Sequence, residues 1–237
     1  ASDVTGGDGR YDLTLDPGSY IIVEGTRDGW FESPDDDTTN VNPGGLLGRE
    51  NFGYLITLDS GETESNNDFA NFQQATKTGT KYEDLDADGS RDGGDTGESG
   101  FTIYAYEDDG DGTLDAGDTL VASDVTGGDG RYDLTLDPGT YIIVEGTRDG
   151  WFESPDDDTT NVNPSGFGGA ENSGYLITLD SGEVDSGNDF ANFQQATKTG
   201  PKYEDLDADG SRDGGDTGEA GFTIFAYADD GDGTLDA

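Results

Sequence analysis

The chain contains no cysteine, histidine or methionine, and basic residues are scarce. Without cysteine and histidine it has no disulfide, no zinc-finger ligand set and no imidazole for a catalytic triad. Eleven basic residues stand against 54 acidic ones, for a formal net charge of −43. Such a chain cannot neutralise phosphates, so nucleic acid and anionic membrane surfaces are excluded as partners. No apolar run approaches the roughly 18 residues that membrane insertion needs.

Glycine is abundant, with 40 of 237 residues, and hydrophobic residues make up only 30%. This composition borders on that of disordered chains. However, the 11 Tyr, 11 Phe and 2 Trp residues occur in short alternating runs. We therefore expect a folded chain with thin cores.

The sequence is a tandem repeat. Residues 1–116 and 122–237 align without a gap at an offset of 121, and 103 of the 116 positions are identical. The polar stretch QQATKTG (73–79) is the expected seam between domains. We therefore expect residues 1–72 to be the C-terminal part of one repeat, 73–193 a complete repeat, and 194–237 the N-terminal part of the next. Near-identical neighbours can also exchange strands, so self-assembly into filaments through neighbouring copies of the repeat is a further expectation.

Short strand-like runs dominate the complete repeat, and no segment shows a sustained helical period. Seven runs are bounded by turn residues and predict an all-β, antiparallel seven-stranded β-sandwich: 77–83, 100–106, 119–125, 131–136, 140–147, 174–179 and 188–194. In the second run, Phe101, Ile103 and Ala105 alternate with more polar side chains. This alternation predicts one buried face and one solvated face.

Acidic segments within each repeat have the spacing of calcium-binding loops. In the twelve-residue segment DLDADGSRDGGD, carboxylates occupy positions 1, 3, 5, 9 and 12, glycine occupies position 6, and Ser90 at position 7 offers its carbonyl. The segment EDDGDGTLDAGD repeats the pattern. The predicted Ca²⁺ ligands of these two loops are Asp84, Asp86, Asp88, Ser90, Asp92, Asp95, and Glu107, Asp109, Asp111, Thr113, Asp115, Asp118.

The second copy supplies two further loops. Their predicted Ca²⁺ ligands are Asp205, Asp207, Asp209, Ser211, Asp213, Asp216, and Asp230, Asp232, Thr234, Asp236. In the last loop Ala228 replaces the carboxylate at position 1, so this site should be weaker or should recruit Asp229 or water. The competing interpretation is a solvated acidic turn in a uniformly acidic protein. Calcium is favoured because clustered carboxylates repel one another without a cation.

The complete repeat resembles the B repeats of serine-aspartate-repeat surface adhesins, relatives of the collagen-adhesin B-type (prealbumin-like) domains. KYEDLDADGSRDGGDTGESGFTIYAY resembles their first strand, calcium loop and second strand. SDVTGGDGRYDLTLDPGTYIIVE resembles their hairpin and Pro-Gly-x-Tyr turn, and NDFANF their closing strand. The resemblance implies a calcium-stabilised, prealbumin- or Ig-like sandwich, repeated in tandem as a stalk on a secreted, extracellular or cell-surface protein.

Some relatives in that family form an internal Lys–Asn isopeptide bond with the help of a buried acid. By resemblance, Glu145 stands where the acid would be. Lys77 or Lys81, and Asn188 or Asn192, are the possible reactants. The first strand lacks the family's Lys–apolar pattern, so the sequence favours a domain without the bond.

The sequence fits structural, binding and enzymatic functions unequally. The leading interpretation is a structural stalk or filament segment that sets length and stiffness, and not an enzyme, because carboxylates committed to repeated metal loops leave no single catalytic pair. The alternative is an adhesin module that grips glycan or protein through residues 148–174, with Trp151 and Phe152. Trp151 is equally suited to capping the sandwich core, which we favour. A dockerin-like module is disfavoured because β-type sequence follows each loop.

Overall fold

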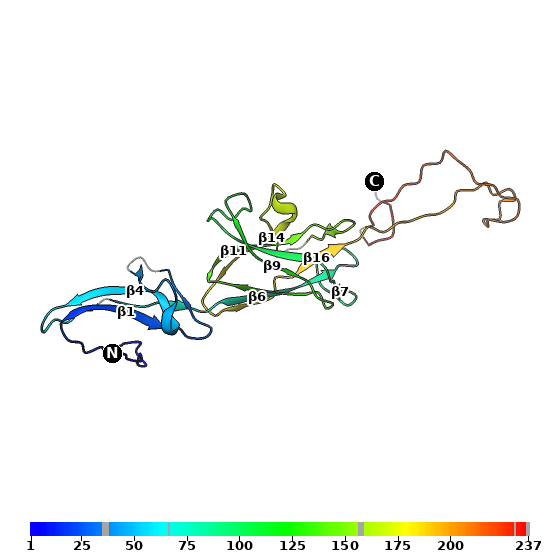
Figure 1. Cartoon of the computed structure of the whole chain (residues 1–237). Helices are drawn as coiled ribbons and strands as arrows, with labels where there is room; N and C mark the ends of the chain where they lie inside the picture. The colour runs from blue at the N-terminus through cyan, green and yellow to red at the C-terminus, as the bar shows by residue number, and fades with distance from the viewer. Residues whose placement is uncertain (35–37, 66, 156–158, 230, 236–237) are drawn as a thin grey trace. The chain divides into compact units, whose positions relative to one another are not determined.

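The computed structural model describes residues 1–34, 38–65, 67–155, 159–229 and 231–235. It comprises two compact units, Ala1–Gln194 and Gln195–Ala237. Strands dominate the first unit, and the only helices among the described residues are two short 3-10 turns, Leu46–Gly48 and Phe167–Gly169 (Figure 1). Within this part of the chain, no helix is both long and apolar enough to cross a membrane.

The complete repeat folds as two facing sheets. One sheet has the order β13-β14-β11-β8-β9, and the other has the order β10-β6-β16-β12 with β7 and β15 also paired to β6. The strands of the first sheet are β8 (Thr102–Glu107), β9 (Thr119–Val125), β11 (Gly139–Gly146), β13 (Thr160–Asn161) and β14 (Ala170–Leu179). Those of the second are β6 (Ala75–Glu83), β7 (Thr96–Gly97), β10 (Arg131–Leu136), β12 (Phe152–Glu153), β15 (Val184–Asp185) and β16 (Phe190–Phe193).

All seven expected runs are strands, and four short strands (β7, β12, β13 and β15) join them. Most pairs are antiparallel, as expected. The exception is β6, which runs parallel to both β15 and β16, so that Phe190 lies opposite Lys81 and Asn192 lies opposite Glu83. The first and last strands of the repeat are therefore direct neighbours in one sheet (Figure 1).

The main core lies between the two sheets. Ile103, Tyr132, Leu134, Ile143 and Phe190 are among its buried members. In β10 the burial alternates strictly, with Tyr132, Leu134 and Leu136 inside and the residues between them exposed. This period of two is what a half-buried strand requires.

The prediction of a solvated outer face on β8 is wrong in part. Phe101, Ile103 and Ala105 are buried as expected, but Tyr106 on the opposite face is only 6% exposed. A second apolar cluster covers this face: Tyr106, Leu114, Ile142, Val144, Val162 and Ala170. Leu114 comes from the second acidic loop, and Val162 comes from the 148–174 insertion. These two segments cover the outer face of the sheet, and we call them the lid.

Residues 1–72 contain one three-stranded sheet, in the order β1-β4-β3, and the separate pair β2-β5. The strands are β1 (Gly18–Gly25), β2 (Phe31–Glu32), β3 (Thr39–Asn40), β4 (Arg49–Leu58) and β5 (Asn71–Phe72). In the second unit, the described residues hold a single isolated bridge between Tyr203 and Gly218.

Candidate functional site

A buried lysine lies at the centre of the complete repeat. Lys81, on β6, has no exposed surface. Its Nζ donates hydrogen bonds to the carbonyl oxygens of Tyr82 (2.7 Å) and Phe190 (3.4 Å). The same nitrogen lies 4.7 Å from the centre of the Phe101 ring and 6.0 Å from that of Trp151. Aromatic faces attract the ammonium form, but they do not replace its hydration.

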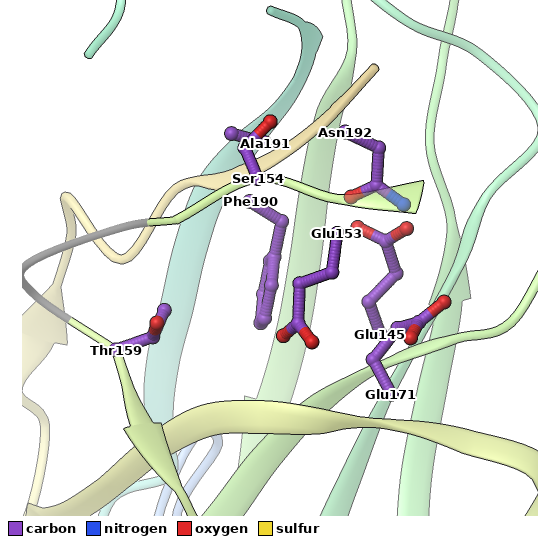
Figure 2. A pocket seen from close by; sticks show the side chains of 8 residues that line it. All are labelled: Glu145, Glu153, Ser154, Thr159, Glu171, Phe190, Ala191 and Asn192. Atoms are coloured by element: carbon purple, nitrogen blue, oxygen red, sulfur yellow. The ribbon is translucent and has the colours of Figure 1, made fainter. Parts of the chain in front are cut away.

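Glu145 faces this lysine from the opposite sheet. It lies on β11, is 1% exposed, and its Oε2 is 3.8 Å from Lys81 Nζ. Among the described residues, neither carboxylate oxygen has a hydrogen-bond partner. Figure 2 shows Glu145 in a small pocket that Glu153, Glu171 and Asn192 also line.

Asn192 supplies the third polar group. It lies on β16, opposite Glu83 of β6, and is 2% exposed. Because alternate residues of a strand share a face, Asn192 and Lys81 point to the same side of the sheet. In the part of the chain that the structure describes, the Asn192 Nδ2 is buried without a hydrogen-bond partner. An amine and a carboxyl group are thus buried in contact, and a buried carboxamide lines the same pocket as the carboxyl group.

Burial controls the protonation of this centre. Desolvation lowers the pKa of Lys81 to about 8, although the Glu145 charge opposes the fall. Desolvation raises the pKa of Glu145 to about 8, against the Lys81 charge and with the added repulsion of Glu171 and Glu153. Near neutral pH the lysine therefore has access to its nucleophilic, uncharged form, while the glutamic acid can hold a proton.

The structure places the four possible reactants in different surroundings. Lys77 of β6 is also buried, but its Nζ lies 3.5 Å from Oδ1 of Asp185, which belongs to β15. Asn188 is half-buried, and its backbone carbonyl accepts a hydrogen bond from Tyr132 Oη (2.7 Å). Lys81 Nζ, in contrast, lies 3.8 Å from Glu145 Oε2, and Asn192 lines the pocket that Glu145 also lines. The sequence signal for this difference was weak, because it depends on the parallel register of β6 and β16.

Trp151 covers one side of this centre. Its ring packs edge-on against Phe101, with 5.2 Å between centroids, and the Arg148 guanidinium lies 5.8 Å from its centre. Phe101 is itself buried in the sandwich. These contacts favour the capping role for Trp151 over the ligand-gripping one.

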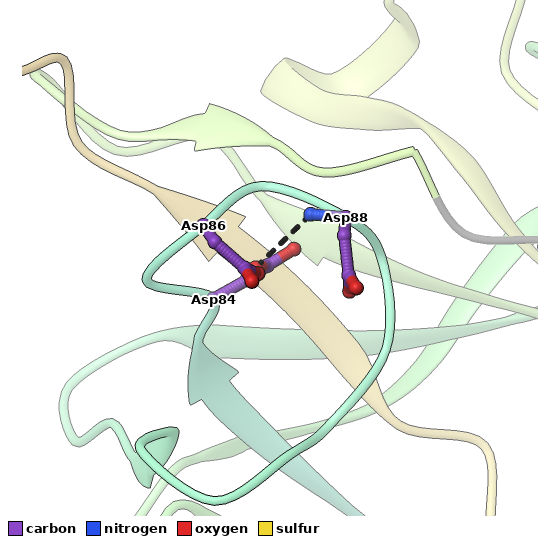
Figure 3. Close-up of side chains that lie close together, drawn as sticks. All are labelled: Asp84, Asp86 and Asp88. Carbon is purple, nitrogen blue, oxygen red and sulfur yellow. Dashed lines mark hydrogen bonds between the residues drawn. The ribbon is translucent and has the colours of Figure 1, made fainter. Parts of the chain in front are cut away.

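The first acidic loop brings three carboxylates together. One oxygen each from Asp84, Asp86 and Asp88 lies within 4.8 Å of the others (Figure 3). Asp84 is fully buried and accepts hydrogen bonds from the backbone N–H groups of Gly89 (2.9 Å) and Asp88 (3.3 Å). Repulsion by Asp88 is the largest cause that raises the pKa of Asp86.

The remaining predicted residues of this loop close the turn. Asp95 accepts hydrogen bonds from the backbone N–H groups of Leu85 (3.2 Å) and Asp92 (3.0 Å). The Ser90 N–H donates to Asp88 Oδ1 (2.7 Å). The carboxylates of Asp92 and Asp95 are not part of the converging trio.

The second loop converges on a different set from the predicted one. The trio is Asp108, Asp109 and Asp118, and Asp108 was not among the predicted ligands. Its Oδ1 accepts the Gly112 N–H (2.9 Å), as Asp84 does from Gly89 in the first loop. The predicted Glu107 ends β8, where it pairs with Thr119 and Tyr141.

The other predicted residues of the second loop hold its backbone. Asp111 accepts the Thr113 N–H (2.8 Å), and Asp118 Oδ2 accepts the Asp115 N–H (2.7 Å). A Cβ added at Gly117 would clash with the Asp109 carboxylate and come within 3.2 Å of Asp115 Oδ1. Asp109 and Asp115 therefore approach the same point.

The loops of the second copy repeat these features. Asp205, Asp207 and Asp209 form a third converging trio. Asp216 accepts the N–H groups of Leu206 and Asp213 (both 3.2 Å), and Asp209 accepts that of Ser211 (2.7 Å). In the last loop, Asp232 accepts both the N–H and the hydroxyl of Thr234 (2.8 Å each). The predicted ligands Asp230 and Asp236 lie outside the described residues.

The donor chemistry of the trios suits a hard cation. All of the converging atoms are carboxylate oxygens, which Ca²⁺ and Mg²⁺ prefer. Within the described residues, the ion pairs of Lys and Arg do not include a member of the first trio. Its charges are therefore left for solvent or a metal ion to compensate.

Comparison with known proteins found likeness in structure only. No family model and no curated protein matches the chain. Similar solved structures include the shaft pilin spaA from Lactobacillus rhamnosus GG, which is 14% identical with a TM-score of 0.37 over 52% of each chain. They also include GBS52, the minor pilin of the Gram-positive pathogen Streptococcus agalactiae, which is 13% identical with a TM-score of 0.31 over 62% of each chain.

A further similar structure is the group B streptococcus pilus 2b backbone protein, at 13% identity and a TM-score of 0.29 over 60% of this chain and 48% of that one. The chain spans about half the length of the spaA structure. These neighbours are pilins, so the resemblance to serine-aspartate-repeat B repeats stays a prediction. Because every one of these TM-scores is below 0.5, we base the proposed function on this chain's own residues.

Proposed function

We propose that the 73–193 repeat is a load-bearing module of an extracellular surface stalk or filament. In this proposal a covalent Lys81–Asn192 bond and calcium ions in the acidic loops brace the module. The observation that carries it is that Lys81, Glu145 and Asn192 are all buried, with Lys81 Nζ 3.8 Å from Glu145 Oε2 and with Asn192 lining the same pocket as Glu145. A buried ion pair with such poor hydrogen bonding is costly to keep.

Condensation would remove that cost. The neutral Nζ of Lys81 attacks Cγ of Asn192, and the protonated Glu145 gives its proton to Nδ2. The Cγ–Nδ2 bond breaks, ammonia leaves, and the Glu145 carboxylate takes up the proton that Nζ loses. One amide bond replaces another, so no oxidant or energy source is required, and a single secondary amide takes the place of the amine and the primary amide.

The location of the bond suits a mechanical role. The repeat begins with β6 and ends with β16, and these strands are adjacent and parallel. Tension applied through the two ends of the repeat therefore loads this pair directly. A covalent bond between Lys81 and Asn192 would transmit the tension directly from β6 to β16. The chain between these two residues would then not be stretched, so that β8, β11 and β14 stay folded.

Calcium would stiffen the connections that precede and follow β8. The Asp84 trio follows β6, and the Asp108 trio follows β8. Leu114 of the second loop is fully buried, and its N–H donates to the Val162 carbonyl (2.6 Å). An ion that orders this loop would also hold the lid over the outer face of the sheet. Ion binding to the folded state alone adds about 2.7 kcal/mol of stability at a hundredfold excess over Kd.

Intact-mass measurement tests the covalent part of the proposal. The 237-residue chain should weigh less than its sequence mass by one ammonia for the complete repeat, and peptide mapping should place the link between Lys81 and Asn192. The variants Lys81→Ala and Asn192→Ala should not lose this ammonia. The variant Glu145→Gln should lose it more slowly or not at all.

Asn188→Ala is the matched control, because its side chain belongs to the same closing segment and is not a proposed reactant. It should retain the mass loss. A wild-type chain that keeps its full sequence mass after folding, with Lys81 recovered as a free amine, would rule out the bond.

A further inference from the structure

The first acidic loop (84–95) contacts the strand that carries Asn192. The loop begins directly after β6, and the backbone N–H of Asp84 donates to the Asn192 carbonyl (2.9 Å). In the parallel pair of β6 and β16, Asn192 lies opposite Glu83, the residue before Asp84. The loop therefore starts at the point where the backbone of the proposed reactant is held.

Two further contacts join the loop to the same pair of strands. The guanidinium of Arg91, in the loop, lies 3.9 Å from Oδ2 of Asp189, which belongs to the closing segment. The hydroxyl of Tyr82, on β6, donates to the carbonyl of Gly89 in the loop (3.3 Å). The loop thus contacts the closing segment at Asp189 and again at Asn192.

Asp84 connects the interior of the loop to Asn192 through both its side chain and its backbone. Its carboxylate is fully buried and accepts the N–H groups of Gly89 (2.9 Å) and Asp88 (3.3 Å), which closes the turn. Its own N–H donates to Asn192. A change in the loop that moves Asp84 therefore also moves the backbone of Asn192.

The Asn192 side chain depends on such backbone contacts for its position. Asn192 is 2% exposed, and in the described part of the chain its Nδ2 has no hydrogen-bond partner. Its backbone is held by Asp84 after β6, and it lies opposite Glu153 of β12. Reacting atoms must be held about 3–3.5 Å apart for attack, so a small displacement of this backbone is enough to slow the reaction.

Order in the loop depends on compensation of its charges. One carboxylate oxygen each from Asp84, Asp86 and Asp88 lies within 4.8 Å of the others, and like charges at this range repel one another. Carboxylate oxygens are the ligands that Ca²⁺ prefers, and a bound cation offsets the repulsion. Asp84 is therefore shared between the candidate cation site and the contact that positions Asn192.

We propose that calcium in the first acidic loop controls formation of the Lys81–Asn192 bond, with Asp84 as the positioning residue that connects the two sites. The inference rests on the bond and the calcium loop of the proposed function. In the calcium-bound loop, Asp84 is fixed and holds Asn192 within reach of Lys81. Without the cation, repulsion loosens the loop, Asn192 is less often in reach, and the bond forms slowly. A chain made where free Ca²⁺ is scarce would stay unlinked until it meets calcium.

The rate of ammonia loss from a chain that starts unlinked tests the proposal. The 237-residue chain is made with a photocaged lysine at position 81 and purified in urea, where light removes the cage. Dilution into Ca²⁺ or into EDTA starts folding, intact mass follows the loss of one ammonia, and circular dichroism gives the folded fraction. Coupling between two sites typically amounts to about 5–150-fold, and we expect the loss per folded chain to be about tenfold or more faster in Ca²⁺.

Charge variants identify the loop that is responsible. Asp86→Asn with Asp88→Asn keeps Asp84 but removes two carboxylates of the first trio, and it should abolish the acceleration by Ca²⁺. Asp133→Asn with Asp149→Asn is the matched control, because it removes the same charge at exposed positions outside the loops. This control should keep the acceleration of wild type.

Arg91 tests the contact with the closing segment without removing a predicted ligand. Arg91→Ala deletes the ion pair with Asp189 and should reduce the acceleration by up to about fivefold, the size expected for a partly exposed pair. Arg131→Ala deletes an exposed ion pair with Asp129 and should leave the acceleration unchanged.

A second readout does not depend on the rate. Coupling between two sites is reciprocal, so the linked wild-type chain should bind Ca²⁺ at the first loop more tightly than the unlinked Asn192→Ala chain, by about 5–150-fold. Isothermal titration of the two folded chains measures this difference. A loop that only stabilised the fold would bind Ca²⁺ equally in both.

Two results would overturn the inference. One is an equal rate of ammonia loss per folded chain in Ca²⁺ and in EDTA, while titration shows Ca²⁺ bound at the first loop. The other is an acceleration that persists in the Asp86→Asn, Asp88→Asn chain. In both cases the bond still forms, so the covalent part of the proposed function stands. A folded, calcium-loaded chain that never loses ammonia would instead contradict the bond itself, and this inference with it.

Discussion

At the scale of single residues, the decisive fact is that Lys81 and Glu145 are both buried and poorly hydrogen-bonded. A charge in such a place is destabilising unless it is paired and well solvated by the protein. Here the ion pair is 3.8 Å long, and the neighbouring acids Glu153 and Glu171 add repulsion to Glu145. In the proposed reaction, the same cost favours the uncharged amine of Lys81 and the protonated form of Glu145.

The unlinked variant Asn192→Ala should therefore show a stability minimum near pH 8. Folding raises the pKa of Glu145 to about 8, so the folded state holds an extra proton below that value and stability falls as pH rises toward it. Folding lowers the pKa of Lys81 to about 8, so the unfolded state binds more protons above that value and stability rises again up to the ordinary pKa of lysine. Melting temperatures measured from pH 5 to pH 10 would test this.

The double variant Glu145→Gln, Asn192→Ala is the control for this profile. It should lose most of the decline below pH 8 and keep the part due to Glu171, whose pKa burial also raises. An Asn192→Ala profile that is flat, or that has a maximum near pH 8, would contradict the assignment of the coupled pair.

Gly79 tests the packing around β6. A Cβ at this position would clash with the Asn188 carbonyl and with the Tyr132 ring. The Tyr132 hydroxyl donates to that same carbonyl, so neither neighbour can move without breaking the contact. We expect Gly79→Ala to destabilise the domain by about 1–3 kcal/mol, as overpacking does. Denaturant unfolding would measure the change.

Gly128→Ala serves as the comparison for Gly79. No atom lies within 4 Å of a Cβ built there. Equal stability of the two variants would mean that β6 is not held as closely against β10 and the 188–190 segment as the structure indicates.

At the scale of elements, the acidic loops and the lid are coupled. Leu114 ties the second loop to the Val162 backbone, and both residues belong to the cluster that covers β8 and β11. The sequence predicted the loops from spacing, but it did not predict that one of them supplies a core residue. The loops are therefore part of the packing of the sandwich as well as candidate metal sites.

Chelation should lower the stability of the domain. We expect EDTA to reduce the melting temperature by many degrees and excess Ca²⁺ to restore it, because bound ions compensate the repulsion within each trio. The double variant Asp86→Asn, Asp88→Asn should lose the part of this response that comes from the first loop. Differential scanning calorimetry, with isothermal titration of Ca²⁺, would measure both effects.

Exposed acids outside the loops provide the control for charge alone. Asp133→Asn with Asp149→Asn removes the same charge at exposed positions and should leave the calcium response unchanged. A melting temperature that EDTA does not alter would mean that the loops are ordered by their backbone hydrogen bonds and that calcium has no structural role.

At the scale of the whole molecule, nearly identical sequences differ in strand pairing and in burial. Within 73–193 the strands are paired and the apolar residues are buried, whereas the described residues of the second unit hold one isolated bridge and expose Phe222, Ile224 and Tyr227. Residues 195–237 correspond to 74–116, which hold β6, β7 and β8, and in the complete repeat these strands pair with β10, β11 and β16. Strand sequence alone does not produce a stable sheet without the strands that pack against it.

Limited proteolysis of dilute protein should reflect this difference. We expect trypsin to cut first after Lys198, Lys202 and Arg212, because the backbone around them is exposed. Lys77 and Lys81 should resist, since both are fully buried. Mass spectrometry of the early fragments would identify the cuts. Early cleavage after Lys81 would contradict a folded complete repeat.

Local patterns in the sequence determined the repeat, the seven main strands and the position of the acidic loops, because each depends on residues close together in the chain. Tertiary structure decided the rest. It brought Lys81, Glu145 and Asn192 together from three strands, placed Asp108 in the second trio while Glu107 ended β8, and covered the outer face of β8. These outcomes depend on sheet register and on contacts between distant segments, which a period of two does not encode.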